Sequence, residues 1–198
     1  MKNQKLSGTL LFLAGSLSFM GIITAEAFYP IVYTTSKNEI SDLGATRPPN
    51  SLIFEPSATL FNASMLLAGI LVLLSIYFQY KFSRKLLFTI PFGLFGLGLV
   101  GVGIFPGNID PYHGLSAMLL FLSGGISAIT AFKISLAPFK YFGIILGSVA
   151  LTAWFLAMFF PSILISSIGM GGTERWVAYP ILLWLTGLGG YLMNENNT

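Results

Sequence analysis

The stretch LLFTIPFGLFGLGLVGVGIF, from Leu86 to Phe105, contains no charged side chain and decides the class of fold. An α-helix rises about 1.5 Å per residue, so this stretch is long enough to cross the roughly 30 Å hydrocarbon core of a bilayer. The whole chain is 55% hydrophobic and only 9% charged, whereas soluble domains carry about 25% charged residues. The sequence therefore predicts an all-α integral membrane protein.

Five further stretches have the same apolar character, which gives six predicted transmembrane helices. They cover residues 10–33, 58–78, 86–105, 114–132, 141–160 and 176–193. No polar stretch is long enough for a second domain, so residues 1–198 are expected to form one six-helix transmembrane domain. The long connection, residues 34–57, is too polar and too rich in proline to be a span.

A cleaved signal peptide is the alternative interpretation of the first span. Lys2 and Lys5 precede an apolar core, and Ala25-Glu26-Ala27 has the small-residue spacing of a cleavage site. The apolar run continues beyond Ala27, which favours a helix that stays in the protein.

Basic residues are distributed unequally between the two predicted sides of the membrane. Seven lie on the side of the termini and three on the other: Lys2, Lys5, Lys81, Arg84, Lys85, Lys133 and Lys140 against Lys37, Arg47 and Arg175. Lysine and arginine favour cytoplasmic loops. We therefore expect a multi-pass protein of the cell membrane with both termini in the cytoplasm and the long loop outside.

Acidic residues show the opposite distribution. Six of the seven acidic side chains, and the only histidine, fall on the predicted outer side: Glu26, Glu39, Asp42, Glu55, Asp110, Glu174 and His113. The orientation rule counts basic residues only, so this clustering is an independent observation. It indicates where a functional site lies without naming its chemistry.

Glu26 and His113 are the two most unusual members of this group. Glu26 lies within the first span, about one turn before Pro30, where an ionisable group is costly and normally faces the protein interior. It is either a proton-exchanging or ligand-binding carboxylate or a structural group that reaches the interface. His113 begins the fourth span, where the helix N-terminus disfavours the imidazolium form. A neutral histidine there could act as a base or as a hydrogen-bond partner.

Glu174 and Arg175 open the sixth predicted span. The carboxylate suits the positive end of a helix, but the guanidinium opposes it. Arg175 is therefore expected to pair with Glu26, Asp42 or Glu174, or with an anionic ligand such as a phosphate or lipid headgroup.

The segment from Asn38 to Gly44 in the long loop has two interpretations. It is either a short surface helix that ends at Gly44 or a lid over the bundle with Ser41 and Asp42 turned inward. The candidate ligand-binding residues are Glu26, Asp42, Asn62, His113, Glu174 and Arg175. If the protein is an enzyme, His113 or Glu26 would be the base and Arg175 would hold an anion, but the sequence assigns no catalytic residue.

Several kinds of site find little support in the sequence. With no cysteine and one histidine, a zinc centre or a haem held by two histidines is not expected, and no cofactor is predicted. Carboxylates alone leave only a hard cation such as Ca²⁺ open. The segment Gly96–Gly101 matches a dinucleotide-binding fingerprint but lies mid-span, where glycine favours helix packing. Scattered basic residues also argue against a nucleic-acid partner.

An internal repeat is suggested by three aromatic–proline pairs. Spans one, three and five end at Tyr29-Pro30, Phe105-Pro106 and Phe160-Pro161. These pairs indicate three copies of a helical hairpin. The alternative is that aromatic residues and helix-ending prolines gather at membrane interfaces in any case.

Three groups of motifs carry a family resemblance. These are Ile40-Ser41-Asp42-Leu43-Gly44, then Gly103-Ile104-Phe105-Pro106 followed by His113, then Glu174-Arg175 with Tyr179-Pro180 and Leu183-Trp184. In their order and spacing, from about Leu10 to Leu192, they resemble the prokaryotic membrane family called domain of unknown function 998. The resemblance implies a six-helix integral membrane protein. It supplies no activity and no catalytic residues.

The function expected from these observations is an outward-facing polar pocket that binds a small polar molecule or a lipid headgroup. Its partners would be the bilayer, a lipid headgroup or small anionic ligand, and other membrane subunits. One alternative is an accessory or assembly subunit of a larger membrane complex. A second is a proton-coupled transporter that uses Glu26, although the cytoplasmic halves of the spans carry few polar groups beyond serine and threonine.

Overall fold

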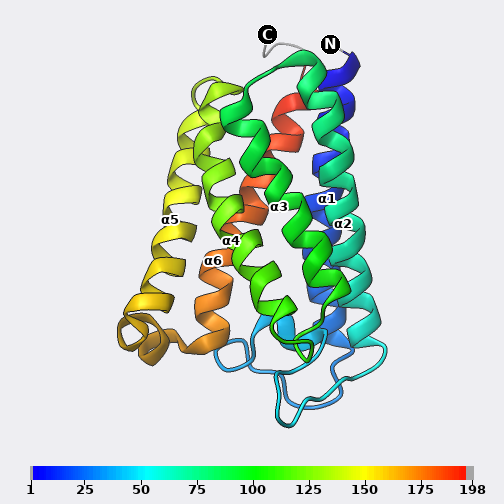
Figure 1. Cartoon of the computed structure of the whole chain (residues 1–198), viewed down its shortest axis with the longest axis vertical. Coiled ribbons are helices and arrows are strands. Elements are labelled where there is room, and N and C mark those ends of the chain that lie inside the picture. Colours follow the sequence, from blue (N-terminus) through cyan, green and yellow to red (C-terminus); the bar gives the residue numbers. More distant parts are fainter. Residues whose placement is uncertain (1, 195–198) are drawn as a thin grey trace.

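Six long helices make up most of the chain in the computed structural model, which describes residues 2–194 (Figure 1). They are α1 (Lys2–Ala27), α2 (Ser57–Phe82), α3 (Leu86–Ile104), α4 (Tyr112–Thr130), α5 (Phe139–Phe159) and α6 (Pro161–Met193). Two short 3₁₀ helices, η1 (Ile40–Leu43) and η2 (Ala131–Lys133), lie in the connections. Each long helix is long and apolar enough to span a membrane. The predicted all-helical membrane fold with six spans is confirmed.

The helices form a ring in which each one packs against its neighbour in sequence. The ring closes through α6, which packs against α1, and α4 also touches α6. Figure 1 shows the start of α1 and the end of α6 at one end of the bundle, called here the terminal end. The α1–α2 connection covers the opposite end, called here the loop end.

Glycines let the helix backbones of this ring approach closely. A Cβ atom on Gly8 of α1 would lie 2.7 Å from the carbonyl oxygen of Gly189 of α6. A Cβ atom on Gly98 of α3 would lie 2.5 Å from the backbone nitrogen of Leu120 of α4. Gly98 belongs to the apparent dinucleotide fingerprint, so that motif serves helix packing here.

Aromatic side chains fill the bundle axis from its centre toward the terminal end. Phe88, Phe92, Phe95 and Trp184 are all fully buried. The rings of Phe88 and Phe92 stack with centroids 4.8 Å apart, and Trp184 meets Phe92 edge-on at 6.0 Å. This packing leaves the loop end as the place where polar groups can gather.

Two helices differ from the prediction by more than four residues at an end. The first covers Lys2–Ala27 instead of residues 10–33, and it ends three residues before the helix-breaking Pro30. The sixth begins at Pro161 instead of Trp176 and is interrupted at Gly169, which has φ 78° and ψ 173°. Proline suits a first helical turn, and only glycine adopts the Gly169 conformation readily. The interruption divides α6 into two helical segments.

The three aromatic–proline pairs all lie at the loop end, just beyond the last residues of α1, α3 and α5. Their placement agrees with the predicted arrangement of hairpins. The internal repeat itself stays a prediction.

Candidate functional site

The α1–α2 connection, residues 28–56, folds over the loop end and is called here the cap (Figure 1). Its apolar side chains anchor it to the helices, because Ile40 and Leu43 of η1 are buried in the hydrophobic core. Tyr29 packs edge-on against Tyr33 and Phe54, with ring centroids 5.2 and 5.0 Å apart. The cap, which includes η1, is therefore packed against the helices and closes the loop end of the bundle.

The side chain of Arg175 of α6 binds backbone carbonyl groups of the cap. One guanidinium nitrogen donates hydrogen bonds of 2.9 Å to the carbonyl oxygens of Thr35, Asn38 and Gly171, and the other donates to the Tyr33 hydroxyl at 2.9 Å. Only 9% of Arg175 is exposed. Buried carbonyl oxygens need donors, and a guanidinium offers five.

The carboxylate partner expected for Arg175 is absent among the residues that the structure describes. Within those residues an ion pair joins Arg47 to Glu39, and none reaches Arg175. The prediction of a carboxylate partner is therefore wrong, because the cap carbonyls take its place, and the alternative of an anionic ligand stays a prediction.

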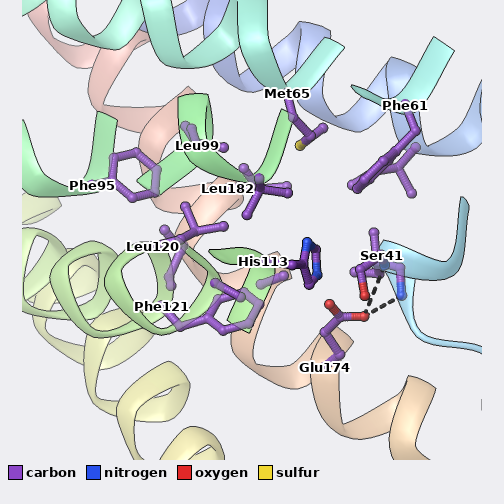
Figure 2. Close-up of a pocket in the computed structure, with 16 residues that line it drawn as sticks. Ser41, Phe61, Met65, Phe95, Leu99, His113, Leu120, Phe121, Glu174 and Leu182 are labelled. Carbon is purple, nitrogen blue, oxygen red and sulfur yellow. Dashed lines mark hydrogen bonds between the residues drawn. The ribbon is translucent and has the colours of Figure 1, made fainter. Parts of the chain in front are cut away.

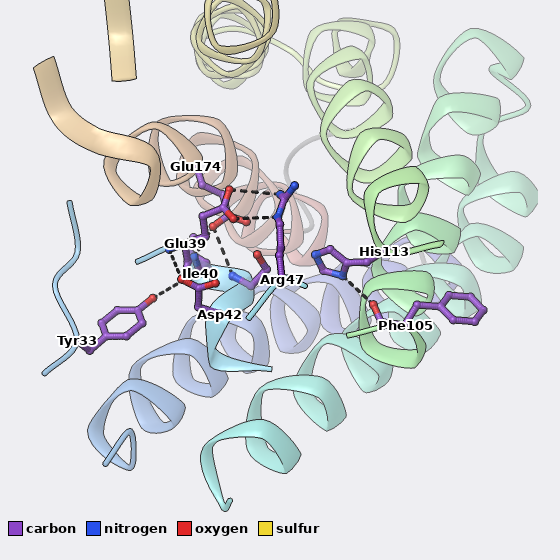
Figure 3. A network of polar contacts seen from close by, with 9 residues as sticks. Tyr33, Glu39, Ile40, Asp42, Arg47, Phe105, His113 and Glu174 are labelled. Atoms are coloured by element: carbon purple, nitrogen blue, oxygen red, sulfur yellow. Dashed lines mark hydrogen bonds and ion pairs between the residues drawn. The ribbon is translucent and has the colours of Figure 1, made fainter. Parts of the chain in front are cut away.

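Glu174, the preceding residue, binds the opposite polar groups of the same segment. Its carboxylate accepts hydrogen bonds from the backbone N–H groups of Ile40 and of Ser41, the latter at 3.4 Å. These N–H groups belong to the first residues of η1, and a negative charge is favourable beside the exposed N–H groups at a helix N-terminus. Figure 3 shows the contact between Glu174 and Ile40, with the Tyr33 hydroxyl bonded to the neighbouring Glu39 carbonyl oxygen. Two adjacent residues of α6 thus bind the cap in opposite ways: Glu174 accepts from its N–H groups and Arg175 donates to its carbonyl oxygens.

Glycines at the α6 interruption make this close contact possible. A Cβ atom on Gly169 would lie 1.9 Å from the Ser36 carbonyl oxygen, and one on Gly171 would lie 2.0 Å from that of Asn38. The Gly171 N–H also donates to the Ser36 oxygen at 3.1 Å. Any larger residue at these positions would push the cap away.

His113 lies in the first turn of α4 and is 2% exposed. Its Nδ1 is 2.7 Å from the carbonyl oxygen of Phe105. A carbonyl only accepts, so Nδ1 carries the proton and Nε2 of the neutral ring holds a lone pair. No hydrogen-bond partner for Nε2 occurs within residues 2–194. The connection after α3 therefore sets both the tautomer and the orientation of the ring.

Two cavities meet at His113 and Glu174. The first, of about 50 Å³, lies among five helices on the bundle axis and is called here the axial cavity. The second, of about 320 Å³, lies between α4, α5 and α6 and is called here the lateral cavity. Ser41, Ala117 and Phe121 also line both. Figure 2 shows the His113 ring and the Glu174 carboxylate turned toward the same space from α4 and α6.

Charged residues of the cap border the lateral cavity. Arg47 Nε lies 3.2 Å from a Glu39 carboxylate oxygen, and both residues line the cavity (Figure 3). The Glu39 N–H donates to Asp42 Oδ2 at 3.0 Å. Burial raises the pKa of the Glu39 carboxyl, although Arg47 opposes this effect. Burial also raises the pKa of Asp42, against the hydrogen bond from Glu39.

The sequence-predicted residues divide into two groups. His113 and Glu174 face common cavities, as the prediction of one outer cluster requires. Asp42 instead caps η1, and Arg175 binds the cap carbonyls.

The remaining two candidates lie apart from these cavities. Asn62 faces Gly44 in a separate groove, with its Oδ1 buried and unpaired. Glu26, in the last turn of α1, lines neither cavity that His113 lines. The structure does not bring Glu26 into a common cavity with His113.

Some contributors were not among the candidates. The ion pair of Glu39 with Arg47 and the hydroxyl of Tyr33 complete the polar layer under the cap. The glycine-rich start of GMGGTER, residues 169–175, was the one sequence signal for a close backbone approach here. No group of three or more acidic or histidine side chains is arranged to hold a metal ion in the part of the chain that the structure describes.

Residues 12–191 match the family described as protein of unknown function (DUF998). The chain belongs to this family. The match covers nearly all of the chain and confirms the resemblance carried by the cap, the α3–α4 connection and the start of the second segment of α6. Among curated proteins and solved structures, none matches the chain.

Proposed function

We propose that this multi-pass membrane protein binds a small polar molecule or a lipid headgroup in the two cavities at the loop end. One observation carries the proposal: His113 presents an unpaired Nε2 to a cavity that the Glu174 carboxylate also lines. Ligand sites are typically apolar cavities into which a few polar groups converge. A bound ligand with hydrogen-bond donors would pair with Nε2 and with the carboxylate.

The packing of the bundle favours binding over transport. The axial cavity ends at Phe95 and Leu99, and below it Phe88, Phe92 and Trp184 fill the axis. A transporter needs polar groups along a path through the whole bundle. The two phenylalanines offer none and Trp184 offers a single indole N–H, so these side chains form no polar path and the cavities act as a site open at one end.

The orientation of the site belongs to the same proposal. Seven basic residues lie at the terminal end and three at the loop end. The preference of lysine and arginine for cytoplasmic loops supports an orientation with the loop end outside. The ligand would come from the outer leaflet or the space beyond it.

Native mass spectrometry of the protein released from lipid nanodiscs tests the binding proposal. The wild type is expected to keep a stoichiometric adduct through mild activation. His113→Asn keeps an amide donor for Phe105 and removes the Nε2 lone pair, so the adduct should be lost while the protein stays folded. Ser75→Ala is the matched control, because Ser75 is buried in α2 and bonds only to its own helix.

Two results would contradict the proposal. A wild type that carries no adduct from native membranes has no retained ligand. An adduct that survives unchanged in His113→Asn does not depend on the histidine. A thermal unfolding midpoint like that of the wild type shows that the variant is folded.

A further inference from the structure

We infer that the lateral cavity takes the hydrocarbon chain of an amphiphile from the bilayer, whose neutral or cationic head donates hydrogen bonds to His113 and Glu174. This inference rests on the proposed function and names its ligand class. The two ends of the lateral cavity differ in polarity: one is lined by apolar side chains and the other by charged and polar ones.

The deep part of the lateral cavity is apolar. Its walls come from three helices: Met118 and Phe121 of α4, Trp154, Ala157 and Met158 of α5, and Ile165, Met170 and Val177 of α6. Methionine is flexible and polarisable, so a wall with three methionines adapts to a chain of variable shape. The volume of about 320 Å³ is in the range of small-ligand pockets. These walls suit hydrocarbon.

The lateral cavity adjoins a second groove, between α4 and α5. Trp154 lines the lateral cavity and also lines this groove with Leu122, Leu151 and Phe155. Figure 1 shows α4 and α5 diverging toward the loop end, with α6 visible between them. Nearer the terminal end the same helices pack tightly, since a Cβ atom on Gly147 would lie 2.6 Å from the Gly125 oxygen. A chain can therefore enter sideways only in the loop half.

The polar end of the lateral cavity favours a head that donates hydrogen bonds. It holds two carboxylates, Glu39 and Glu174, and one cation, Arg47, which is already paired with Glu39. His113 adds an acceptor at Nε2. Arg175 is turned away to the cap carbonyls. A phosphate would meet carboxylates without a free cation, whereas hydroxyl or ammonium groups complement this surface.

Gly114 provides a way to fill the lateral cavity without disturbing the fold. It lines the cavity, and a Cβ atom built on it meets no atom within 4 Å. Gly190 of α6 also has nothing within 4 Å and lies away from the cavity, near the terminal end. Gly114→Leu should therefore occupy the space of the ligand, and Gly190→Leu is its matched control.

Tryptophan fluorescence with brominated amphiphiles tests the inference. Bromine quenches tryptophan on contact, and Trp154 lies in the cavity wall. Trp176→Phe serves as the background, because Trp176 is 56% exposed and would be quenched by bulk lipid, whereas Trp184 is 1% exposed. Three probes are added at low mole fraction to reconstituted protein: dibromostearoyl glycerol, a dibromo-octadecyl amine and dibromostearic acid.

Saturable quenching is expected from the glycerol ester, the amine or both, and these two arms separate a hydroxyl head from an ammonium head. Gly114→Leu should raise the half-saturating mole fraction about tenfold, whereas Gly190→Leu leaves it unchanged.

Two results overturn the inference: saturation by the fatty acid alone, or equal quenching of Gly114→Leu and its background. In either case a co-purified adduct that depends on His113 would still support the proposed function. A wild type that carries no such adduct, with saturable quenching intact, would instead contradict the proposed function while the lateral cavity still binds a chain.

Discussion

The terminal half of the bundle and its loop end use polar side chains differently. Near the terminal end, Ser75 bonds to Val72 of its own helix, and Gln79 bonds to Ser83 and Thr89 at the adjoining turn. At the loop end, Arg175 and Glu174 bond to residues more than 130 positions away in the sequence. In the terminal half these polar groups therefore satisfy the backbone of their own helix and the adjoining turn. At the loop end they attach the cap, a separate segment, over the cavities.

The two regions also differ in where their polar side chains meet open space. Both contain buried polar atoms without a partner, such as Trp184 Nε1 toward the terminal end and Arg175 Nε at the loop end, and neither of these residues lines the axial or lateral cavity. The polar side chains that do line these cavities, His113 and Glu174 among them, belong to the loop end. A mostly apolar cavity with a few converging polar groups is the usual form of a ligand site. This difference favours the loop end as the candidate site.

Labelling of single cysteines tests which end faces the outside, and its effect should be all or none. The chain has no cysteine, so each introduced thiol is unique. Asn50→Cys in the cap is expected to react with an impermeant reagent on intact cells if the loop end lies outside, as the distribution of basic residues predicts. Ser83→Cys, between α2 and α3, should react only after the membrane is permeabilised.

The reverse pattern would put the cavities on the cytoplasmic side and remove the outer leaflet as the source of the ligand. Gly171, though it lies at the same end, is unsuitable for labelling because it is buried against the cap.

The sequence was sufficient for the span count and for part of the site. Long uncharged stretches such as residues 86–105 have few alternatives to a membrane helix. His113 and Glu174 were among the candidates because the acidic residues and the only histidine cluster on one predicted side of the membrane. That inference did not require knowing which face of its helix each of these two residues occupies.

What the sequence missed depends on backbone geometry. Arg175 was expected to meet a carboxylate, but its partners are carbonyl oxygens, which every residue carries and no pattern distinguishes. The cost of an ionisable group within a span pointed to Glu26, yet Glu26 does not line the axial or lateral cavity. The early start of α6 was hidden because Gly169 interrupts the helix, and a polar run after it resembles a loop.

Gly169→Ala should show how strongly the loop end depends on close backbone contact. The new methyl group would lie 1.9 Å from the Ser36 oxygen, at a φ of 78° that side chains rarely adopt. Strain of this kind costs about 1–3 kcal/mol, and the displaced cap adds to it. We expect a loss in stability of about 3 kcal/mol, measured by thermal unfolding in detergent.

Gly190→Ala is the control in the terminal half, because its methyl group meets nothing. It should leave the stability unchanged or raise it by up to about 1 kcal/mol, since alanine favours helix. Equal losses from the two substitutions would mean that the cap contributes no special constraint, and the contrast between the regions would fail.

The smallest expected effect is a dependence of stability on pH that originates in the cap. The ordinary pKa values of Glu39 and Asp42 are 4.5 and 3.8, and burial raises both in the folded protein. The folded state therefore holds these protons more tightly than the unfolded chain does. Their contribution to stability is fully present below the ordinary pKa values and is lost as pH rises through the raised ones.

Thermal unfolding in detergent, scanned upward from about pH 4, should show this loss. Glu39→Gln replaces the titrating carboxyl with an amide that does not titrate. The thermal unfolding midpoint of this variant should therefore vary less with pH than that of the wild type. Arg47→Met removes the opposing cation and should make the loss steeper, although an exposed ion pair contributes only about 0–1 kcal/mol. A wild-type midpoint that rises across this window, and rises equally in Glu39→Gln, would show that burial of the cap carboxyls does not govern its stability.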